Sequence, residues 1–186
     1  MAILNDHQIT DAGQSWRDHL GRYAPQKSVE WERWISCNQK TMSQIDFAEW
    51  LERNMGDIAN AEGFPTGTAM LQMATNLEVS QDSKFRSALR LQSGGVRMEY
   101  VQDDDAGTVA SMEVFSKFAL GIPVFRGGEA YKVEARLKYR LKEGRLTFSY
   151  ELMRADQTLE AAAKTMTQAI GNVTGFPLFH GNPFAR

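Results

Sequence analysis

Basic residues recur at alternate positions along two stretches of the sequence, residues 84–100 and residues 130–153. In both stretches they alternate with apolar residues, which predicts β-strands with one solvated face and one buried face. Cations repeated along one strand face are suited to the phosphate groups of a nucleic acid. The candidate nucleic-acid-binding residues are therefore Arg86, Arg90, Arg97, Lys132, Arg136, Lys138, Arg140 and Lys142.

Two interpretations of these basic residues remain open. If the two hairpins join one sheet with the same orientation, they form a cationic surface for single- or double-stranded DNA. The alternative is an ordinary solvated face, because Lys and Arg often protect sheets against edge pairing. The sequence pI of 5.9 argues against strong nonspecific DNA binding, although the acidic residues are concentrated in another part of the chain.

No combination of residues predicts a catalytic centre or a metal site. His7, His19 and His180 are far apart and match no zinc spacing, and Cys37 has no cysteine partner. The adjacent carboxylates of Asp103-Asp104-Asp105 alternate in direction, which favours a solvated loop over a cation site. We therefore expect a protein that is not an enzyme and has no cofactor. A metal-dependent nuclease built from separated carboxylates is the weaker alternative.

Aromatic residues form a second set of candidates. The tryptophans are most simply core residues, but Trp is also enriched at protein interfaces. The partner-interface candidates are Trp31, Trp34, Trp50, Phe176, Phe179 and Phe184. An acidic, Trp-bearing helical surface predicts an alternative function, a module that binds another protein. The extended aromatic tail predicts a homo-oligomer, because an exposed apolar segment needs a partner surface.

The charge distribution divides the 186 residues into three parts. Residues 1–83 carry a net charge of -6, residues 84–154 a net charge of +4, and residues 155–186 none. We expect a single domain, residues 1–186, of the α+β class. An antiparallel sheet of five to seven strands from residues 84–153 is covered by helices from the acidic part, residues 1–83, and by one C-terminal helix. That helix and the extended aromatic tail make up residues 154–186.

Capping residues place the ends of the helices. Ser28 and Ser43 precede the apolar stripes of two short helices, and Thr66 or Thr68 precedes a third helix that continues to about Val79. The C-terminal helix is expected to begin with Asp156 and to continue to about residue 170, with Gly171 or Gly175 ending it.

Strand and loop signals complete the assignment. Residues 2–4 favour a short strand, and residues 5–14 favour a polar loop. Residues 109–120 favour one strand that Gly121-Ile122-Pro123 ends or bends, because proline donates no ladder hydrogen bond.

The composition also bears on location. No apolar run reaches the length of about 20 residues that a membrane-spanning helix needs. The N-terminus has no basic segment followed by an apolar one, so it does not resemble a signal peptide. A single cysteine excludes an internal disulfide, which fits a reducing cytoplasm.

Four segments resemble the uncharacterised phage and prophage protein family typified by YfdQ. These are the Trp31–Trp34 helix, the Ser43–Glu52 helix, the segment Phe118–Tyr131 and the strand Val133–Arg140. The resemblance extends from about Ala2 to Gly181 and includes no catalytic residue.

The resemblance implies a phage or prophage accessory protein that acts in the cytoplasm of a bacterial host, among recombination and replication functions. For the alternative, a protein-binding module, it implies a host protein of defence or replication as the partner. Members of the family carry an additional N-terminal region. We therefore expect this chain to be a short member or a fragment.

Overall fold

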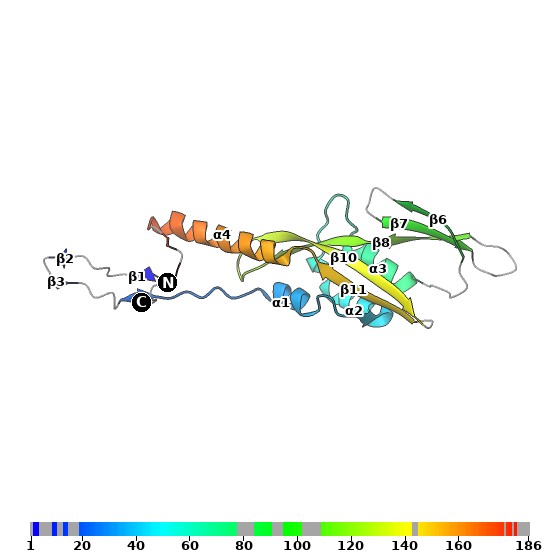
Figure 1. The fold of residues 1–186 in the computed structure, drawn as a ribbon, viewed down its shortest axis with the longest axis horizontal. Coiled ribbons are helices and arrows are strands. Elements are labelled where there is room, and N and C mark those ends of the chain that lie inside the picture. Colours follow the sequence, from blue (N-terminus) through cyan, green and yellow to red (C-terminus); the bar gives the residue numbers. More distant parts are fainter. Residues whose placement is uncertain are drawn as a thin grey trace.

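The computed structural model describes residues 2–3, 9–10, 13–14, 19–77, 84–90, 95–101, 109–142, 145–176, 178–179 and 181. For residues 9–10, 13–14, 84–90, 95–101, 109–113 and 141–142 the description is limited to the backbone and its pairing. Figure 1 shows α1 and α2 beside the strands β10 and β11, and α4 extending away from them. The α+β class with antiparallel sheets is confirmed.

Three short helices and one 3-10 turn form the described helical part before residue 77. They are α1 (Val29–Ser36), α2 (Gln44–Asn54), η1 (Met55–Asp57) and α3 (Gly67–Asn76). Each α-helix begins after a predicted cap, because the Oγ or Oγ1 atoms of Ser28, Ser43 and Thr66 accept backbone N–H groups three residues on. The third helix ends at Asn76, before the predicted end near Val79, because Leu77 leaves the helical conformation with ψ 91°.

A four-stranded antiparallel sheet packs against these helices. Its order is β5-β11-β10-β9, with β5 (Met42–Ser43), β9 (Lys117–Pro123), β10 (Ala130–Lys142) and β11 (Arg145–Leu152). The predicted hairpin of residues 130–153 is confirmed as β10 and β11, with Arg136 opposite Glu151. Leu146, Phe148, Tyr150 and Leu152 are buried on the inner face, as the alternation predicted.

The end of β9 differs from the prediction. Residues 121–123 belong to the strand, since Tyr131 pairs with Ile122 and Ala130 with Pro123. Proline is tolerated there because it is the last residue of a strand at the sheet edge. A Cβ on Gly121 would lie 3.4 Å from the Cβ of Ala59, so the glycine permits a close approach of the preceding loop.

The strands of residues 84–115 form a separate sheet, so the antiparallel strands are divided between two sheets. This three-stranded sheet has the order β6-β7-β8, with β6 (Lys84–Arg90), β7 (Gly95–Val101) and β8 (Val109–Phe115). β8 and β9 are separated by Ser116 alone, where the predicted single strand of residues 109–120 breaks. Val114 and Phe115 are both buried, which interrupts the two-residue period and redirects the chain.

Aromatic side chains dominate the core between the helices and the inner sheet face. The ring of Phe47 on α2 stacks on Phe148 with centroids 4.8 Å apart. Trp34 on α1 is fully buried and meets Tyr150 edge to face at 5.1 Å. The Tyr150 hydroxyl donates a 2.8 Å hydrogen bond to the Trp34 carbonyl, one of the carbonyls that the last turn of α1 leaves without a helical partner.

The C-terminal helix α4 (Ala155–Thr174) is longer than predicted. It begins after Arg154, which has a positive φ of 52°, and it ends at Gly175, whose φ of 68° suits a glycine. Ala162 is buried, and Ala155 and Leu159 pack against the core, so α4 covers part of the sheet as expected.

Two small antiparallel pairs lie near the N-terminus. The predicted first strand is β1 (Ala2–Ile3), which pairs with β4 (Leu20–Gly21). The segment of residues 5–14, predicted as a polar loop, contains β2 (Ile9–Thr10) paired antiparallel with β3 (Gly13–Gln14), so that part of the prediction was wrong. Within the described part of the chain, no helix is both long enough and apolar enough to span a membrane.

Candidate nucleic-acid interface

Basic side chains gather on the outer face of the four-stranded sheet. The alternation of β10 places Lys132, Arg136, Lys138 and Arg140 on the side opposite the core, and all four are exposed. The register adds Lys117, which pairs with Arg136, and Arg145, which pairs with Lys142. We call this set the cationic face: Lys117, Lys132, Arg136, Lys138, Arg140 and Arg145.

Two carboxylates partly neutralise the cationic face. Glu134 lies 3.5 Å from the ammonium of Lys132, and Glu151 lies 2.7 Å from Lys138 and 3.9 Å from Arg136. The hydrogen bond from Lys138, and then its charge, lower the pKa of Glu151, and Arg136 adds to the effect. Glu151 is therefore ionised at neutral pH. Six cations against two carboxylates leave a surplus of positive charge on this face.

Arg140 and Arg145 lie at the end of the cationic face that is farthest from Lys132. Among the residues that the structure describes, no carboxylate lies within ion-pair distance of Arg140 or Arg145. Thr147 is opposite Arg140, and Ser149 is opposite Lys138, so hydroxyl groups on β11 adjoin the cations on β10. Cations and hydroxyls are the side-chain groups that proteins use to contact phosphate oxygens. Lys142 ends β10 opposite Arg145.

Arg86, Arg90 and Arg97 do not join the cationic face. They belong to the three-stranded sheet, so the two predicted hairpins do not pair in one sheet. Their register also separates them, because Arg90 is opposite Val96 while Arg97 is opposite Leu89. Adjacent register positions belong to opposite faces of a sheet. Arg86 lies at an irregularity of the pairing between Phe85 and Ser87.

The tryptophan candidates have mainly structural positions. Trp31 and Trp34 are buried in the core, so their side chains are not available at the surface to a partner. Trp50 is half-buried and meets Trp34 edge to face, with ring centroids 5.5 Å apart. The simpler interpretation, that the tryptophans are core residues, therefore describes Trp31 and Trp34.

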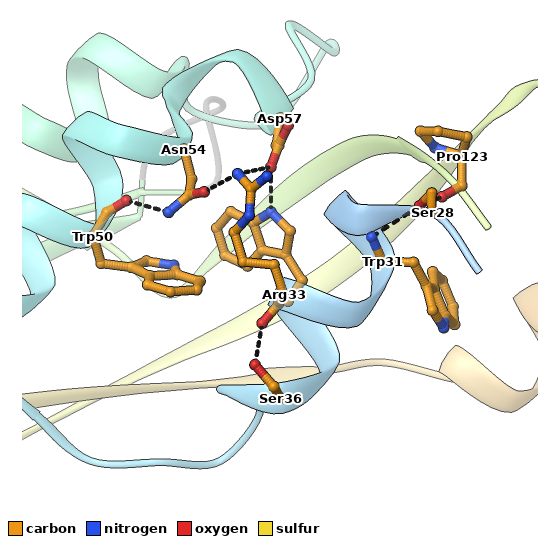
Figure 2. A network of polar contacts seen from close by, with 9 residues as sticks. Ser28, Trp31, Arg33, Ser36, Trp50, Asn54, Asp57 and Pro123 are labelled. Atoms are coloured by element: carbon orange, nitrogen blue, oxygen red, sulfur yellow. Dashed lines mark hydrogen bonds and ion pairs between the residues drawn. The ribbon is translucent and has the colours of Figure 1, made fainter. Parts of the chain in front are cut away.

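A polar network fixes α1 to the end of α2, and the sequence reasoning did not find it (Figure 2). Arg33 donates a hydrogen bond to the Asn54 side chain and lies 3.7 Å from the Asp57 carboxylate. The indole N–H of Trp34 donates to the same carboxylate at 2.7 Å, and Asn54 donates to the Trp50 carbonyl at 2.7 Å. Because these contacts join α1 to the end of α2 and to η1, the network serves to position the helices that cover the sheet.

The tail aromatics differ from the tryptophans. Phe176 and Phe179 lie beyond the end of α4, with 75% and 89% of their surface exposed. Phe184 is outside the described residues. The exposed rings are compatible with the expected homo-oligomer, but no described residue of the chain covers them.

Chemistry-bearing residues are not clustered in the described part of the chain. No group of three or more His, Cys, Asp and Glu side chains there could hold a metal ion. Cys37 is a free, half-buried thiol. It contributes, after burial, to raising the pKa of Tyr150, so that hydroxyl remains protonated and donates its core hydrogen bond. His7, His180 and the carboxylates of residues 103–105 lie outside the described residues.

Phe64 is a neighbour of the cationic face that the sequence reasoning missed. The ammonium groups of Lys117 and Lys132 lie 4.6 and 4.3 Å from the centre of its ring. Phe64 follows Gly63 in a loop whose sequence gives no strand or helix signal. Only the fold brings this loop to the two lysines, so no sequence pattern marks the contact.

Comparison with known proteins identifies a family but no activity. No curated protein and no solved structure matches the chain. A family model described as an uncharacterized conserved protein matches residues 1–183, which is nearly the whole sequence. The chain therefore belongs to this family, DUF2303.

Proposed function

We propose that this protein is a non-enzymatic, nucleic-acid-binding accessory protein, and that the cationic face contacts the phosphate backbone. The observation that supports the proposal is the row of exposed cations along β10, of which Arg140 has no carboxylate partner among the described residues. Phosphate contact supplies most nonspecific affinity for nucleic acids, and it needs cations rather than a deep pocket. The motif resemblance of the sequence adds a proposed role in phage or prophage recombination or replication, inside a bacterial host.

The spacing of the row supports phosphate contact. Alternate residues of a strand are about 6.6 Å apart, so Arg136, Lys138 and Arg140 extend over about 13 Å. The neighbouring hydroxyls of Thr147 and Ser149 add donors and acceptors beside the row. The two carboxylates, Glu134 and Glu151, lie beside Lys132, Arg136 and Lys138, away from Arg140.

Charge reversal tests the proposal. The variant Arg136→Glu/Lys138→Glu/Arg140→Glu should lose binding to fluorescent single-stranded and duplex DNA, measured by anisotropy at about 50 mM salt. The wild-type protein should lose affinity steeply as salt rises, because each phosphate contact releases counterions. Circular dichroism checks folding, which should persist because exposed ion pairs contribute little to stability.

A matched control changes the net charge equally at other sites. The control is Lys40→Glu/Arg53→Glu/Lys164→Glu. It reverses three exposed cations outside the cationic face: Lys40 lies after α1, Arg53 on α2 and Lys164 on α4. This control should keep most of the wild-type affinity. Unchanged binding by the β10 variant, or equal losses in both variants, would overturn the proposal. Absence of wild-type binding at low salt would do so as well.

A further inference from the structure

Phe64 lies in a loop that is fixed at both ends. On one side, the Ala59 N–H donates a 2.8 Å hydrogen bond to the Ala119 carbonyl, and Ile58 pairs with Leu120 on β9. On the other side, Pro65 is buried and Thr66 caps α3. Figure 1 shows this loop, between η1 and α3, projecting from the body of the molecule above β10. The backbone on each side of Phe64 therefore holds its ring in a defined position.

The ring adjoins the cationic face at the end opposite Arg140. Lys117 and Lys132 belong to the outer face by register, because Lys117 pairs with Arg136 and Lys132 with Gly121. Both ammonium groups lie within 5 Å of the centre of the Phe64 ring. From Lys132 to Arg140 the strand rises about 27 Å. A half-buried aromatic ring thus lies at one end of a strip of cations.

An aromatic ring beside a cationic strip fits a single strand better than a duplex. Single-stranded nucleic acids are bound by cations that follow the backbone and by aromatic rings on which exposed bases stack. In a duplex the bases are already stacked on one another, and a phenyl ring at its surface meets sugars and phosphates. When a single strand binds, Lys117 and Lys132 would contact its phosphates in place of the Phe64 ring. The face of the ring would then be free for a base to stack on it.

We propose that Phe64 is a base-stacking platform and that the ligand of the cationic face is single-stranded nucleic acid. This inference rests on the proposed function, since the cations must bind phosphates for a base to reach the ring. A structural alternative exists, in which the two cation–π contacts merely hold the loop on the sheet. Exposed contacts of this kind contribute only modestly to stability.

Two substitutions of Phe64 separate the roles. Phe64→Leu keeps an apolar side chain but removes the π face, whereas Phe64→Tyr keeps a ring that can stack. The ligands are a 15-nucleotide oligothymidine, an abasic oligomer of the same length and a 15-base-pair duplex, each with a fluorophore for anisotropy. The abasic oligomer carries the same phosphates without bases, so it reports the electrostatic contribution alone.

Stacking predicts a pattern that a structural role does not. Phe64→Leu should weaken oligothymidine binding about 5- to 150-fold, with an unchanged salt slope and little change for the abasic oligomer or the duplex. Phe64→Tyr should restore most of the affinity. Equal losses on all three ligands, or no loss on oligothymidine, would overturn the stacking role. Wild-type protein that binds none of the ligands would instead refute the proposed function itself.

Discussion

The two faces of the four-stranded sheet are built from alternate residues of the same strands. On β11, the inner residues Phe148 and Tyr150 are fully buried, whereas the outer residues Thr147, Ser149 and Glu151 retain contact with solvent. On β10, Val133, Ala135 and Leu137 are buried between exposed charged residues. A single two-residue period therefore separates the buried side chains from the exposed ones. Inner substitutions should change stability, and outer substitutions should change binding.

The largest expected effect is on the inner face. Phe148→Ala removes a buried ring that stacks on Phe47, and it should lower the free energy of unfolding by about 3–5 kcal/mol. Urea denaturation measures the loss. Arg145→Ala is the matched control, because it changes an exposed residue of the same strand and should stay within about 0.5 kcal/mol of wild type. Similar losses of unfolding free energy in both variants would contradict the expectation that only the inner face determines stability.

A smaller effect is expected from one inner hydrogen bond. Tyr150→Phe leaves the Trp34 carbonyl without its partner, and the loss should be about 1–3 kcal/mol. Because burial raises the pKa of Tyr150, its hydroxyl stays protonated, and the loss should not vary between pH 6 and pH 9. Tyr139→Phe is the control, because Tyr139 is 39% exposed and its loss should be close to zero. Equal losses would mean that the hydrogen bond from Tyr150 to Trp34 adds no stability beyond that of an exposed hydroxyl.

The smallest expected effect is a change in nucleic-acid affinity when a carboxylate of the outer face is neutralised. Glu151→Gln frees Arg136 and Lys138 from their shared carboxylate, so affinity for oligothymidine should rise about twofold to fivefold at low salt. Glu49→Gln removes a carboxylate that pairs with Arg53 away from this face, and it should change binding little. Weaker binding by Glu151→Gln would mean that this carboxylate orders the cations for binding.

The pH dependence of the same carboxylate follows from its lowered pKa. Glu151 stays ionised down to pH values below the ordinary 4.5, so the difference between wild type and Glu151→Gln should be constant above about pH 5. As the pH falls through the lowered pKa, protonation removes the charge and its ion pairs. Wild-type affinity should then approach that of the variant, which an anisotropy titration from pH 6 to pH 3.5 would measure. Convergence of the two affinities already above pH 4.5 would contradict the lowered pKa of Glu151.

Local signals made much of the fold predictable. The caps Ser28, Ser43 and Thr66 are encoded within three residues of the groups they bind, and the β10–β11 hairpin is encoded in its own alternation. The division into two sheets was not predictable, because it depends on the burial of Val114 and Phe115 against α3. Strand alternation fixes which residues share a face, but it does not fix which hairpins share a sheet.

The candidate site was also predictable only in part. The basic residues of β10 were found because they alternate with apolar residues along one strand. Lys117 and Arg145 joined them only through register, since each belongs to a neighbouring strand, β9 or β11. The contact of Phe64 with two lysines depends on a loop that carries no periodic signal. The network of Arg33, Asn54 and Asp57 depends on how α1 packs against the end of α2 and η1, which no local pattern gives.

The distance along the chain between Trp34 and Tyr150 also delays the packing of the helices during synthesis. The two residues are 116 positions apart, and the sheet that α1 and α2 cover is completed only when β11 has left the ribosome. At translation rates of about 5–20 residues per second, the apolar faces of these helices wait about 6–23 s for their partner strands. The newly made helical part is therefore the segment for which a nascent-chain chaperone would have the longest opportunity to bind.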